Sequence, residues 1–582
     1  MTTDQNYQQI YRVGGMLDAG FVGQITYTIS LDQVYDELDI HFSFDKRLYS
    51  ESDVTPELID KLHTLCTAKY NAPTYPVEEF RQTILHEMKT EIHTMAELND
   101  NFIGCIHRQL TDRHMLYTKE FTSDGCLAQD TFSGVLKVTV LVFNVLLDNT
   151  QYTLTVSGHP VGQGVIAPNF NLMDTVKTAA GNAGASNAAG SADISCDAES
   201  APASAVATAG SSGVSGAGSV AMAGDSSATG SSSAGNTVTA STRFKRLELH
   251  NHTVESDGSL TCQELTEYLA ADHVDAFAIT DHNTTSGQKK IEQLLEEKHY
   301  PISLIRGMEY TTYFGHILCL NLSKYVPWNS IDQHRPELLF EAARKKGALV
   351  GIAHPFSYGD PFARGCRFEM TVSDYSKVDF IEIFNNPEPL HEVNERGTNL
   401  WMSLIFSGYK ITATSGMDLH NRAKLAGCYA TYIEGNNGGD IASELDTAIH
   451  THRTWVSKGA LLLTEVLPET NELLLTFTDA HKTGFTVSET AQVVLKGKDQ
   501  TLTMTVSLDK PVRVSLNRFS GTDPIIPLLY EAASDSCVNA AAASTSCSNT
   551  ADASSAAGQL KEIDALPAIE GLLCVSPVLY RD

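Results

Sequence analysis

The sequence predicts an α/β protein whose central part is flanked by β-rich units, and three observations support this fold class. Between residues 244 and 435, short apolar runs alternate with segments of helical periodicity, a pattern that favours parallel βα units wound as a sheet or closed as a barrel. Residues 1–170 and 440–582 carry runs rich in β-branched and aromatic residues, which are typical of strands. Two low-complexity stretches separate or interrupt these parts.

The first unit, residues 1–170, is predicted to mix α and β structure. "FVGQITYTISL" and "ELDIHFSFD" read as strands, whereas residues 56–72 and 76–98 carry apolar positions at helical spacing. The later stretch "SGVLKVTVLVFNVLLDNTQYTLTVSG" reads as two buried strands joined at Asp148 and Asn149.

Two histidines of this unit, His86 and His93, fall on the second predicted helix. They lie too far apart to match the HExxH pattern of a zinc-binding helix. We expect them to be surface or core-edge histidines without a chemical role.

The low-complexity stretches cover residues 174–242 and 532–558 and consist mainly of small and polar residues. Such segments lack the large apolar side chains that offset the entropy of ordering, so they are predicted to be a linker and an insertion. The apolar run that follows the second stretch is expected to return to a core. The predicted organisation is therefore a first unit, a linker, a central unit over 244–435 and a β-rich unit over 440–582.

The overall charge bears on the partners of the protein. The chain of 582 residues has a formal net charge of −29 and no clear basic patch, so it should repel long nucleic acids and anionic membranes. A chain of this length also exceeds what one core can organise. The expected partner is a small-molecule phosphate or ester, and the oligomeric state is not predicted.

Targeting features are not evident in the sequence. The N-terminus lacks the basic and apolar regions of a secretory signal, and no run of about 18 apolar residues suggests a membrane span. The eleven cysteines are scattered without a CxxC pair, which does not resemble a disulfide framework or a zinc ribbon. We therefore expect a cytoplasmic protein in a reducing setting.

Function is indicated by the residues that follow the apolar runs of the central unit. The loops after the carboxyl ends of parallel strands line the ligand-binding face of such folds. Nearly every run is followed by a histidine or a carboxylate; these residues are His250 and His252, Asp281 and His282, Glu309, His316, His354, and Asp418 and His420. Each signal is weak alone, but their recurrence at one predicted face indicates a metal site.

The residue types fit this chemistry. Two histidines at i and i+2 on an extended segment point to the same side, so His250 and His252 can reach one ion. Imidazole and carboxylate ligands together suit zinc, iron or manganese better than calcium or magnesium. Glu309 is the best candidate for a carboxylate that bridges two ions. Such ions polarise a phosphoryl or carbonyl oxygen and lower the pKa of a bound water.

The ordered set HxH…SDG…TDH…E…GH…AHP…DxH over about 245–435 resembles the PHP (polymerase and histidinol phosphatase) family of metal-dependent phosphoesterases, in its SDG-bearing branch. The resemblance implies a distorted (β/α)7 barrel that holds two or three divalent ions, Zn, Mn or Fe, at its strand ends. It implies a first metal site at His250, His252, Glu309 and Asp418. A second site at His316 and His354 would share Glu309, and a third would contain Asp257, His282 and His420.

Candidate residues for catalysis and substrate binding are fewer. Asp281 is interpreted either as an orienter of the metal ligands or as a proton acceptor. A phosphate substrate needs cationic side chains besides the metals, and Arg422 is preferred among the arginines near the motifs, which also include Arg306, Arg364 and Arg453. Asn385 and Asn386 follow "FIEIF" at a predicted strand end and are expected to touch substrate.

Three functions are compatible with these residues. The first is a phosphoesterase that hydrolyses a small phosphorylated metabolite or nucleotide with a metal-activated water. The alternative is a carboxyl-ester, carbamate or amide hydrolase on the same site, which the small number of nearby basic residues favours weakly. A non-catalytic scaffold with a structural metal is less compatible, because a structural site closes with four ligands and this set is larger.

Overall fold

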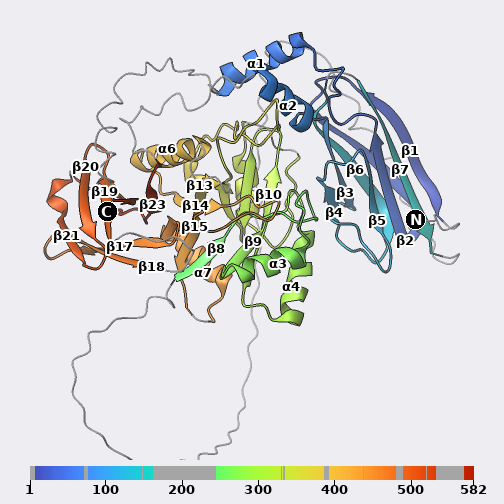
Figure 1. Ribbon diagram of the computed structural model, residues 1–582. Coiled ribbons are helices and arrows are strands. Elements are labelled where there is room, and N and C mark those ends of the chain that lie inside the picture. Colours follow the sequence, from blue (N-terminus) through green and yellow to red (C-terminus); the bar gives the residue numbers. More distant parts are fainter. Residues whose placement is uncertain are drawn as a thin grey trace, which may run out of the picture. The chain divides into compact units, whose positions relative to one another are not determined.

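The computed structural model describes residues 7–70, 77–146, 149–161, 244–329, 331, 334–385, 392–436, 438–479, 489–519, 521–532 and 569–581. Within these ranges the strands form three sheets (Figure 1). Both predicted low-complexity stretches lie outside the described residues, apart from residue 532. The described parts of residues 1–167 and 239–582 belong to one compact unit.

The N-terminal part forms a seven-stranded sheet in the order β1-β7-β2-β6-β3-β4, with β5 paired to β2. Every pair in this sheet is antiparallel. The strands are β1 (Gln8–Leu17), β2 (Gly23–Phe44), β3 (Glu91–Leu98), β4 (Asn101–Ile106), β5 (Asp112–Tyr117), β6 (Phe132–Asn144) and β7 (Thr150–Pro160). The helices α1 (Pro56–Tyr70) and α2 (Val77–Glu87) lie between β2 and β3 in the chain.

One predicted element of this part is wrong. The helical spacing over 76–98 continues only to Glu87, and residues 91–98 form strand β3 instead. Almost every residue of β3 is buried, because Ile92, Ala96 and Leu98 pack in one hydrophobic cluster and Met95 packs in another. A strand buried on both faces shows no alternation, so its apolar positions can imitate a helical period.

The central part contains the expected parallel strands. The strands β8 (Phe244–Glu248), β9 (Ala276–Ile279) and β10 (Ser303–Thr311) are parallel neighbours, as are β12 (Leu349–Ile352), β13 (Phe380–Asn385) and β14 (Thr412–Gly416). Helices α3 (Cys262–Ala271), α4 (Ser286–Lys298), α5 (Glu337–Arg344) and α6 (Glu392–Phe406) connect them. Helix α3 begins with a complete capping box between Thr261 and Glu264, which satisfies two free backbone N–H groups.

The prediction of uniformly parallel βα units is only partly confirmed. Strand β11 (His316–Leu320) is antiparallel to both of its neighbours, β10 and β12. The turn between β10 and β11 has four residues, too few for the crossover that a parallel pair requires. The fold of the central part is therefore mixed α/β.

The sheet also continues past β8 into the C-terminal part instead of closing on β14. Its path of 13 strands runs from β14 through β8 to β15 (Ala430–Glu434), β16 (Thr454–Ser457), β23 (Leu572–Val575), β22 (Ile526–Glu531), β19 (Thr490–Lys496) and β20 (Thr501–Ser507). Among the described residues no ladder joins β14 to β15 or β16. Side chains join them instead, since Thr431 Oγ1 accepts from Ser415 N at 2.9 Å and Thr454 Oγ1 donates to Ala413 O at 2.7 Å.

The rest of the C-terminal part is β-rich, as expected, with one helix, α7 (Ile441–His450). A separate sheet contains β17 (Ala460–Leu467), β18 (Glu472–Asp479) and β21 (Val512–Ser515). The last apolar run of the sequence forms β23, which pairs with β16 and β22. This run therefore returns to a core, as predicted.

The N-terminal sheet shares a hydrophobic core with the central part. Met95, Leu141 and Phe143 from β3 and β6 belong to the same buried cluster as Met308 and Tyr310 of β10. A common core brings the ends of β3 and β4 close to the strands that carry the predicted metal ligands. None of the helices described here has both the length and the apolar character required to cross a membrane.

Candidate metal centre

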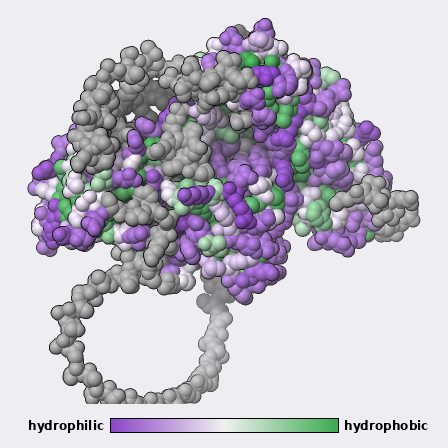
Figure 2. Space-filling view, in the orientation of Figure 1, coloured by the Kyte–Doolittle hydropathy of each residue, from purple (hydrophilic) through white to green (hydrophobic). Residues whose placement is uncertain are grey.

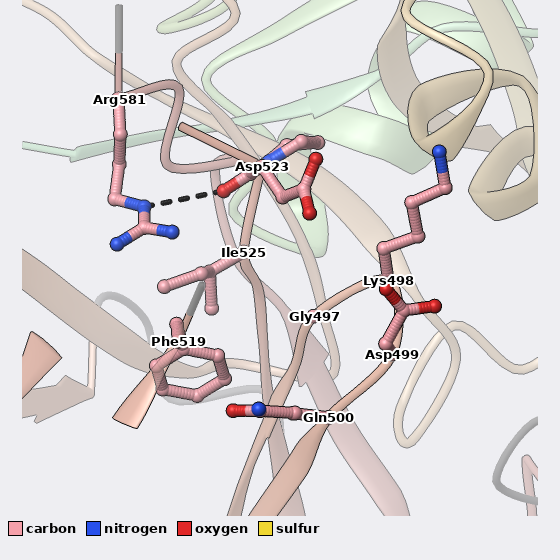
Figure 3. Close-up of a pocket in the computed structure, with 9 residues that line it drawn as sticks. Gly497, Lys498, Asp499, Gln500, Phe519, Asp523, Ile525 and Arg581 are labelled. Carbon is pink, nitrogen blue, oxygen red and sulfur yellow. Dashed lines mark hydrogen bonds between the residues drawn. The ribbon is translucent and has the colours of Figure 1, made fainter. Parts of the chain in front are cut away.

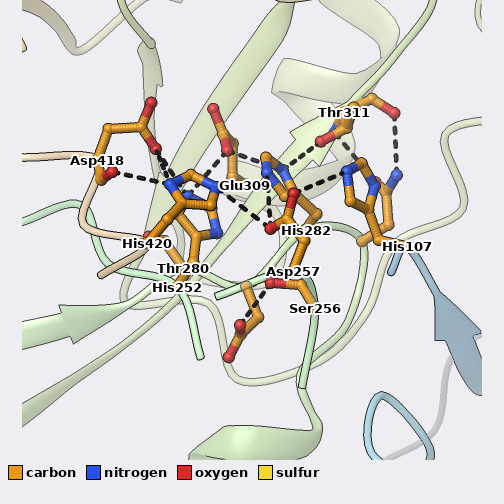
Figure 4. Close-up of polar contacts among 12 residues, drawn as sticks. His107, His252, Ser256, Asp257, Thr280, His282, Glu309, Thr311, Asp418 and His420 are labelled. Atoms are coloured by element: carbon orange, nitrogen blue, oxygen red, sulfur yellow. Dashed lines mark hydrogen bonds and ion pairs between the residues drawn. The ribbon is translucent and has the colours of Figure 1, made fainter. Parts of the chain in front are cut away.

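The predicted metal ligands come from seven places in the central part and meet in one cluster (Figure 4). His250 and His252 follow β8, His282 follows β9, and Glu309 lies inside β10. The remaining ligands are Asp257 in the loop before α3, His316 at the start of β11, His354 after β12, and Asp418 and His420 after β14. The structure thus brings all of the residues expected to bind metal into one place.

Glu309 is at the centre of the cluster and is fully buried. Its Oε1 lies 2.9 Å from His316 Nδ1 and 3.0 Å from His354 Nε2. Its Oε2 faces three other imidazole nitrogens at 2.9, 3.2 and 3.4 Å, those of His282, His250 and His252. The two oxygens therefore face different histidines, which is the arrangement that a bridging carboxylate requires.

The two aspartates occupy opposite sides of His420. Asp418 Oδ1 lies 3.0 Å from His252 Nε2 and 3.4 Å from His250 Nε2. Asp257 Oδ1 lies 3.2 Å from His420 Nε2 and 3.5 Å from His282 Nε2. Each aspartate thus forms a separate group of ligand atoms, all within 4.8 Å of one another, with the histidines around it.

Several buried atoms of the cluster make no hydrogen bond among the described residues, although most of them lie at ion-pair distances from other atoms of the cluster. These atoms are His250 Nε2, His252 Nε2, His316 Nε2, Glu309 Oε2, Asp257 Oδ1 and Asp418 Oδ1. Buried polar atoms are rarely left unpaired, because each costs about 1–3 kcal/mol. Imidazole nitrogens and carboxylate oxygens in this mixture fit zinc, manganese or iron, so the residues present fit the predicted divalent ions.

The electrostatics of the cluster are dominated by burial and by the carboxylates. Burial lowers the pKa of His420, but the charges of Asp257 and Asp418 outweigh it and raise that pKa to about 10. Burial, together with the neighbouring His282 and His420, lowers the pKa of His252 to about 3. Without a metal, the protons are therefore shared unevenly among the imidazoles, and binding of cations would displace some of them.

Two ligands have an unusual backbone conformation. His354 has φ of 23° and Asp418 has φ of 49°, a region that residues other than glycine seldom adopt. Such conformations cost on the order of 1–3 kcal/mol and persist where the surroundings enforce them. For His354 one enforcing contact is clear, since its backbone N donates to Glu382 Oε2 at 2.9 Å.

Glu382, on β13, is an important residue that the sequence did not reveal. Its Oε1 accepts from His250 Nδ1 at 3.0 Å, and its Oε2 also accepts from Asn385 Nδ2 at 3.0 Å. By binding Nδ1–H, Glu382 directs the Nε2 lone pair of His250 toward the cluster. The only signal in the sequence was a carboxylate inside the apolar run "FIEIF".

Asp281 lies beside the cluster but bonds to the loop that carries Asp257. Its carboxylate accepts from Thr253 N at 2.7 Å, from Thr253 Oγ1 at 2.8 Å and from Ser256 Oγ at 2.6 Å. Burial raises the pKa of Asp281 to about 6. These contacts favour the role of an orienter over that of a proton acceptor.

The candidates for substrate contact are dispersed. Arg422 is exposed and lies over the ring of Tyr268, with 5.6 Å between its guanidinium carbon and the ring centroid. Asn385 is buried and donates to Glu382, as described above. Asn386 lies outside the described residues. The structure therefore does not bring Arg422 and Asn385 together around a common space.

Another arginine, Arg364, precedes Gly365, where a Cβ would lie 2.1 Å from Thr312 O, just after β10. Arg364 pairs with Asp360 at 2.9 Å, and two residues further on is Cys366. Burial raises the pKa of the Cys366 thiol well above its ordinary value, with further contributions from the charges of Glu309 and Asp418. The loop carrying Arg364 therefore lies within electrostatic reach of the metal ligands.

The N-terminal sheet also reaches the cluster. His107, just after β4, stacks on His282 with 4.1 Å between ring centroids, and its Nε2 lies 3.5 Å from Asp257 Oδ2 (Figure 4). His93 lies behind it, with 3.9 Å between the two rings. The expectation that His93 is an unremarkable helical residue is therefore wrong. His107 follows an apolar run in "FIGCIHRQL", so it carried the same signal as the central histidines.

A hollow lies in the C-terminal part, around the turn between β19 and β20 (Figure 3). Arg581 Nε there donates to Asp523 O at 3.2 Å. Its lining includes Phe519 and Ile525 but no histidine or cysteine. This hollow therefore lacks the ligands of a transition-metal site.

Comparison with known proteins gives one family match and several partial matches to individual proteins. A family described as a family of unknown function, DUF6669, matches residues 7–160. The 5'-3' exoribonuclease Rnm of Escherichia coli strain K12 is 34% identical over 133 residues, which cover 20% of this chain and 45% of that protein. An uncharacterised protein of Methanocaldococcus jannaschii is 30% identical over 112 residues, covering 19% and 58%. The chain thus matches less than two thirds of either relative.

Solved structures give a weaker likeness. A two-domain protein of Bacteroides vulgatus, described as containing a predicted PHP-like metal-dependent phosphoesterase, has a TM-score of 0.29 at 16% identity. That alignment covers 50% of this chain and 91% of the other. An amidohydrolase from Chromobacterium violaceum has a TM-score of 0.22 at 16% identity, with coverages of 30% and 87%. These likenesses therefore do not identify the function of this chain.

Proposed function

We propose that this protein is a metal-dependent phosphoesterase that hydrolyses a small phosphorylated metabolite or nucleotide. The observation that carries the proposal is the arrangement around Glu309, whose two oxygens face different histidines. Asp418 and Asp257 each belong to a group of possible ligand atoms that includes some of these histidines. A structural metal needs about four ligands in a closed shell. This larger set supports a catalytic centre over a scaffold.

Two or three divalent ions (Zn, Mn or Fe), when bound, supply a water of lowered pKa and polarise the phosphoryl oxygen. His250, His252 and Asp418 would hold one ion, and His316 and His354 a second. Glu309 would serve both, and a third would be held by Asp257, His282 and His420. Glu382 keeps the Nε2 of His250 free for metal, and Asp281 holds the loop that presents Asp257.

The proposal extends to the fold and to the residues that contact substrate. We infer that the central strands are a distorted (β/α)7 barrel of the PHP type, closed by the side-chain links from β14 to β15 and β16. Arg422 is the candidate for binding phosphate oxygens, with Arg364 as a second candidate. Asn385, the last residue of β13, and Asn386 are the candidates for other substrate contacts.

A second candidate substrate is the end of a short RNA chain. Three of the relatives that match this chain are named 5'-3' exoribonucleases, of Escherichia coli, Haemophilus influenzae and Salmonella typhimurium. The net charge of −29 disfavours binding along a long polyanion. Figure 2 shows a face that is largely hydrophilic, with only scattered hydrophobic residues. The terminal phosphodiester of a short chain is therefore a more suitable substrate than the interior of a long one.

A metal analysis and a substrate panel test the proposal. The full chain is stripped of metal, reconstituted with Mn²⁺ or Zn²⁺, and assayed with an aryl phosphate, a bis-aryl phosphate, nucleotides, a 5'-phosphorylated oligoribonucleotide and an aryl acetate. We expect metal-dependent release of phosphate or nucleotide. Turnover of the aryl acetate alone would favour the carboxyl-ester alternative and contradict the proposal.

The variant that links activity to the metal site is the double substitution His250→Ala and His252→Ala. It should lose metal and activity together, because both imidazoles face Asp418 Oδ1. A chain that binds no transition metal and stays inactive after addition of Mn²⁺ or Zn²⁺ would overturn the proposal. A double variant that keeps all activity would point to a scaffold role for the metal.

A further inference from the structure

The loop that carries Asp257 is held from the N-terminal sheet at two points. The first is His107, whose Nε2 lies 3.5 Å from the outer oxygen of Asp257, Oδ2. The inner oxygen, Oδ1, faces His282 and His420 at 3.5 and 3.2 Å. Asp257 thus has one oxygen directed to the other possible metal ligands and the other directed to His107, next to the N-terminal sheet.

The second point is Gly125, which contacts the same loop two residues earlier. Its backbone N donates to the buried carboxylate of Glu255 at 3.0 Å, and its carbonyl accepts from Thr284 Oγ1 at 2.9 Å. Ser286 Oγ also donates to Glu255, at 2.7 Å. Gly125 has φ of 80°, and a Cβ there would lie 2.4 Å from Cys105 O. This close approach requires glycine.

Backbone hydrogen bonds connect these two points. The N of Cys105 donates to Gly125 O at 3.0 Å, and Gly104 forms a bridge with Cys126. Because His107 directly follows β4, the strand that contains Cys105, its position is coupled to that of Gly125. The part of the N-terminal region that contains His107 and Gly125 therefore contacts both Glu255 and Asp257.

His107 itself has little freedom to turn. Its ring lies between His282 and His93, at centroid distances of 4.1 and 3.9 Å. Gln109 Nε2 donates to His107 O at 3.2 Å and to Glu91 Oε1 at 3.3 Å. All of these side chains are buried, and His107 Nδ1 has no hydrogen-bond partner among the described residues. Of the two ring nitrogens, Nε2 is therefore the one that lies near a charged group, the carboxylate of Asp257.

We propose that the N-terminal domain is a working part of the metal centre, in which His107 is a positioning residue that holds Asp257 for the third ion. In this arrangement His107 Nε2, 3.5 Å from Oδ2, interacts with that oxygen and leaves Oδ1 for the metal. The inference rests on the metal site of the proposed function but not on its substrate. It gives a role to the region matched by DUF6669.

The size of the expected effect follows from similar partners in other metal sites. Removing a group that hydrogen-bonds to a metal ligand weakens metal binding by about 10–100-fold. The effect should fall on one ion only, because His107 meets the group around Asp257 and not the group around Asp418. We therefore expect the other ions to bind as in the unmodified protein.

Metal binding by the full chain, without substrate, provides the test. Apoprotein is titrated with Mn²⁺ while free Mn²⁺ is followed by EPR, and the bound equivalents are counted by elemental analysis. His107→Ala should weaken one class of site about 10–100-fold. His107→Gln, which keeps an N–H donor, should recover part of the loss and also serves if the alanine variant fails to fold.

Two further variants decide whether the effect passes through Asp257. In an Asp257→Ala background, His107→Ala should have no additional effect on binding. The matched control is His159→Ala, which removes another histidine of the same domain, paired with Asp36 at 2.7 Å, and should leave all ions unaffected.

Three results would overturn the proposal. The first is wild-type binding of every ion by folded His107→Ala, and the second is an equal weakening of all ions in both backgrounds. The third is loss of an additional ion while the Asp257 site stays intact. In that case His107 would be a ligand together with Glu91 and His93, whose ligand atoms also lie within 4.8 Å of one another. Because no substrate is used, a failed phosphatase assay would not affect the outcome.

Discussion

At the scale of single residues, the metal centre depends on groups that orient its ligands as much as on the ligands. Glu382 is the clearest example, because it contacts the side chain of His250 and the backbone of His354 at once. It thereby fixes the tautomer of one imidazole and the strained backbone of another. A neutral amide in its place could not do both equally well.

Glu382→Gln is expected to weaken metal binding at the site of His250 by about 10–100-fold. The reason is that a glutamine keeps the shape but lacks the charge that strengthens the basicity of His250. Mn²⁺ titration of the apoprotein measures the change. The control is Glu465→Gln on β17, where the same chemical change occurs at an exposed position. Unchanged affinity in Glu382→Gln would show that the ligand geometry does not need this carboxylate.

Most of the cluster could be predicted from the sequence because its members follow apolar runs. His250, His282 and His354 each come within three residues of the end of a short buried strand. Glu382 was not predicted as a site residue because it lies inside an apolar run, where a single carboxylate does not mark the end of a strand. His107 also follows an apolar run, but its contact with Asp257 joins segments that are far apart in the sequence, and no local pattern encodes such a contact.

At the scale of elements, β14 is placed by close packing against the segment that carries His250. A Cβ on Gly416, the last residue of β14, would lie 2.4 Å from His250 Cβ and 2.6 Å from Glu382 Oε1. Both neighbours are buried. The strand end can therefore approach the metal ligands only without a side chain.

Gly416→Ala should destabilise the protein by about 1–3 kcal/mol, the usual cost of overpacking, and should also weaken metal binding because His250 must move. Denaturant unfolding of the apoprotein and Mn²⁺ titration measure the two effects. Gly14→Ala on β1 is the control, since its nearest contact would be an ordinary 3.4 Å. Equal effects in both variants would mean that β14 can shift freely.

Element types were predictable where one face of an element is buried. The alternation of β2 and the amphipathic spacing of α1 both correspond to the structure. The prediction was wrong for residues 91–98, which are buried on both faces. It was also wrong for the direction of β11, because a short turn, not an apolar pattern, determines that direction.

At the scale of the whole molecule, the metal centre and the shared core should make the described parts unfold together. Met95 and Phe143 of the N-terminal sheet pack in one cluster with Met308 and Tyr310 of the central part. A ligand that binds only the folded state stabilises it by RT ln(1 + [L]/Kd). Metal should therefore protect the N-terminal sheet as well as the central one.

Removal of metal by a chelator is expected to reduce the free energy of unfolding by about 2.7 kcal/mol for each site that had been held at 100 times its Kd. Differential scanning calorimetry with and without metal measures the shift. The transition that contains the N-terminal sheet should move with that of the central part. A separate N-terminal transition, unaffected by the chelator, would contradict a common core.

The fold of the whole molecule was the least predictable level. The alternating runs indicated α/β structure, but the continuation of the sheet through β15, β16 and β23 depends on pairings between distant segments. In the same way, composition identified separate units but not the core that joins the first unit to the central one. Such contacts are decided by the fit of surfaces, which a single sequence does not display.

The contact between His107 and Asp257 also has a consequence for inheritance. Two parts of one metal centre are encoded far apart, and neither the glycine at 125 nor the histidine at 107 serves the N-terminal sheet alone. A recombination event that replaced this sheet with an unrelated one would leave Asp257 without its partner. Gene rearrangements are therefore expected to transmit the two parts as a pair.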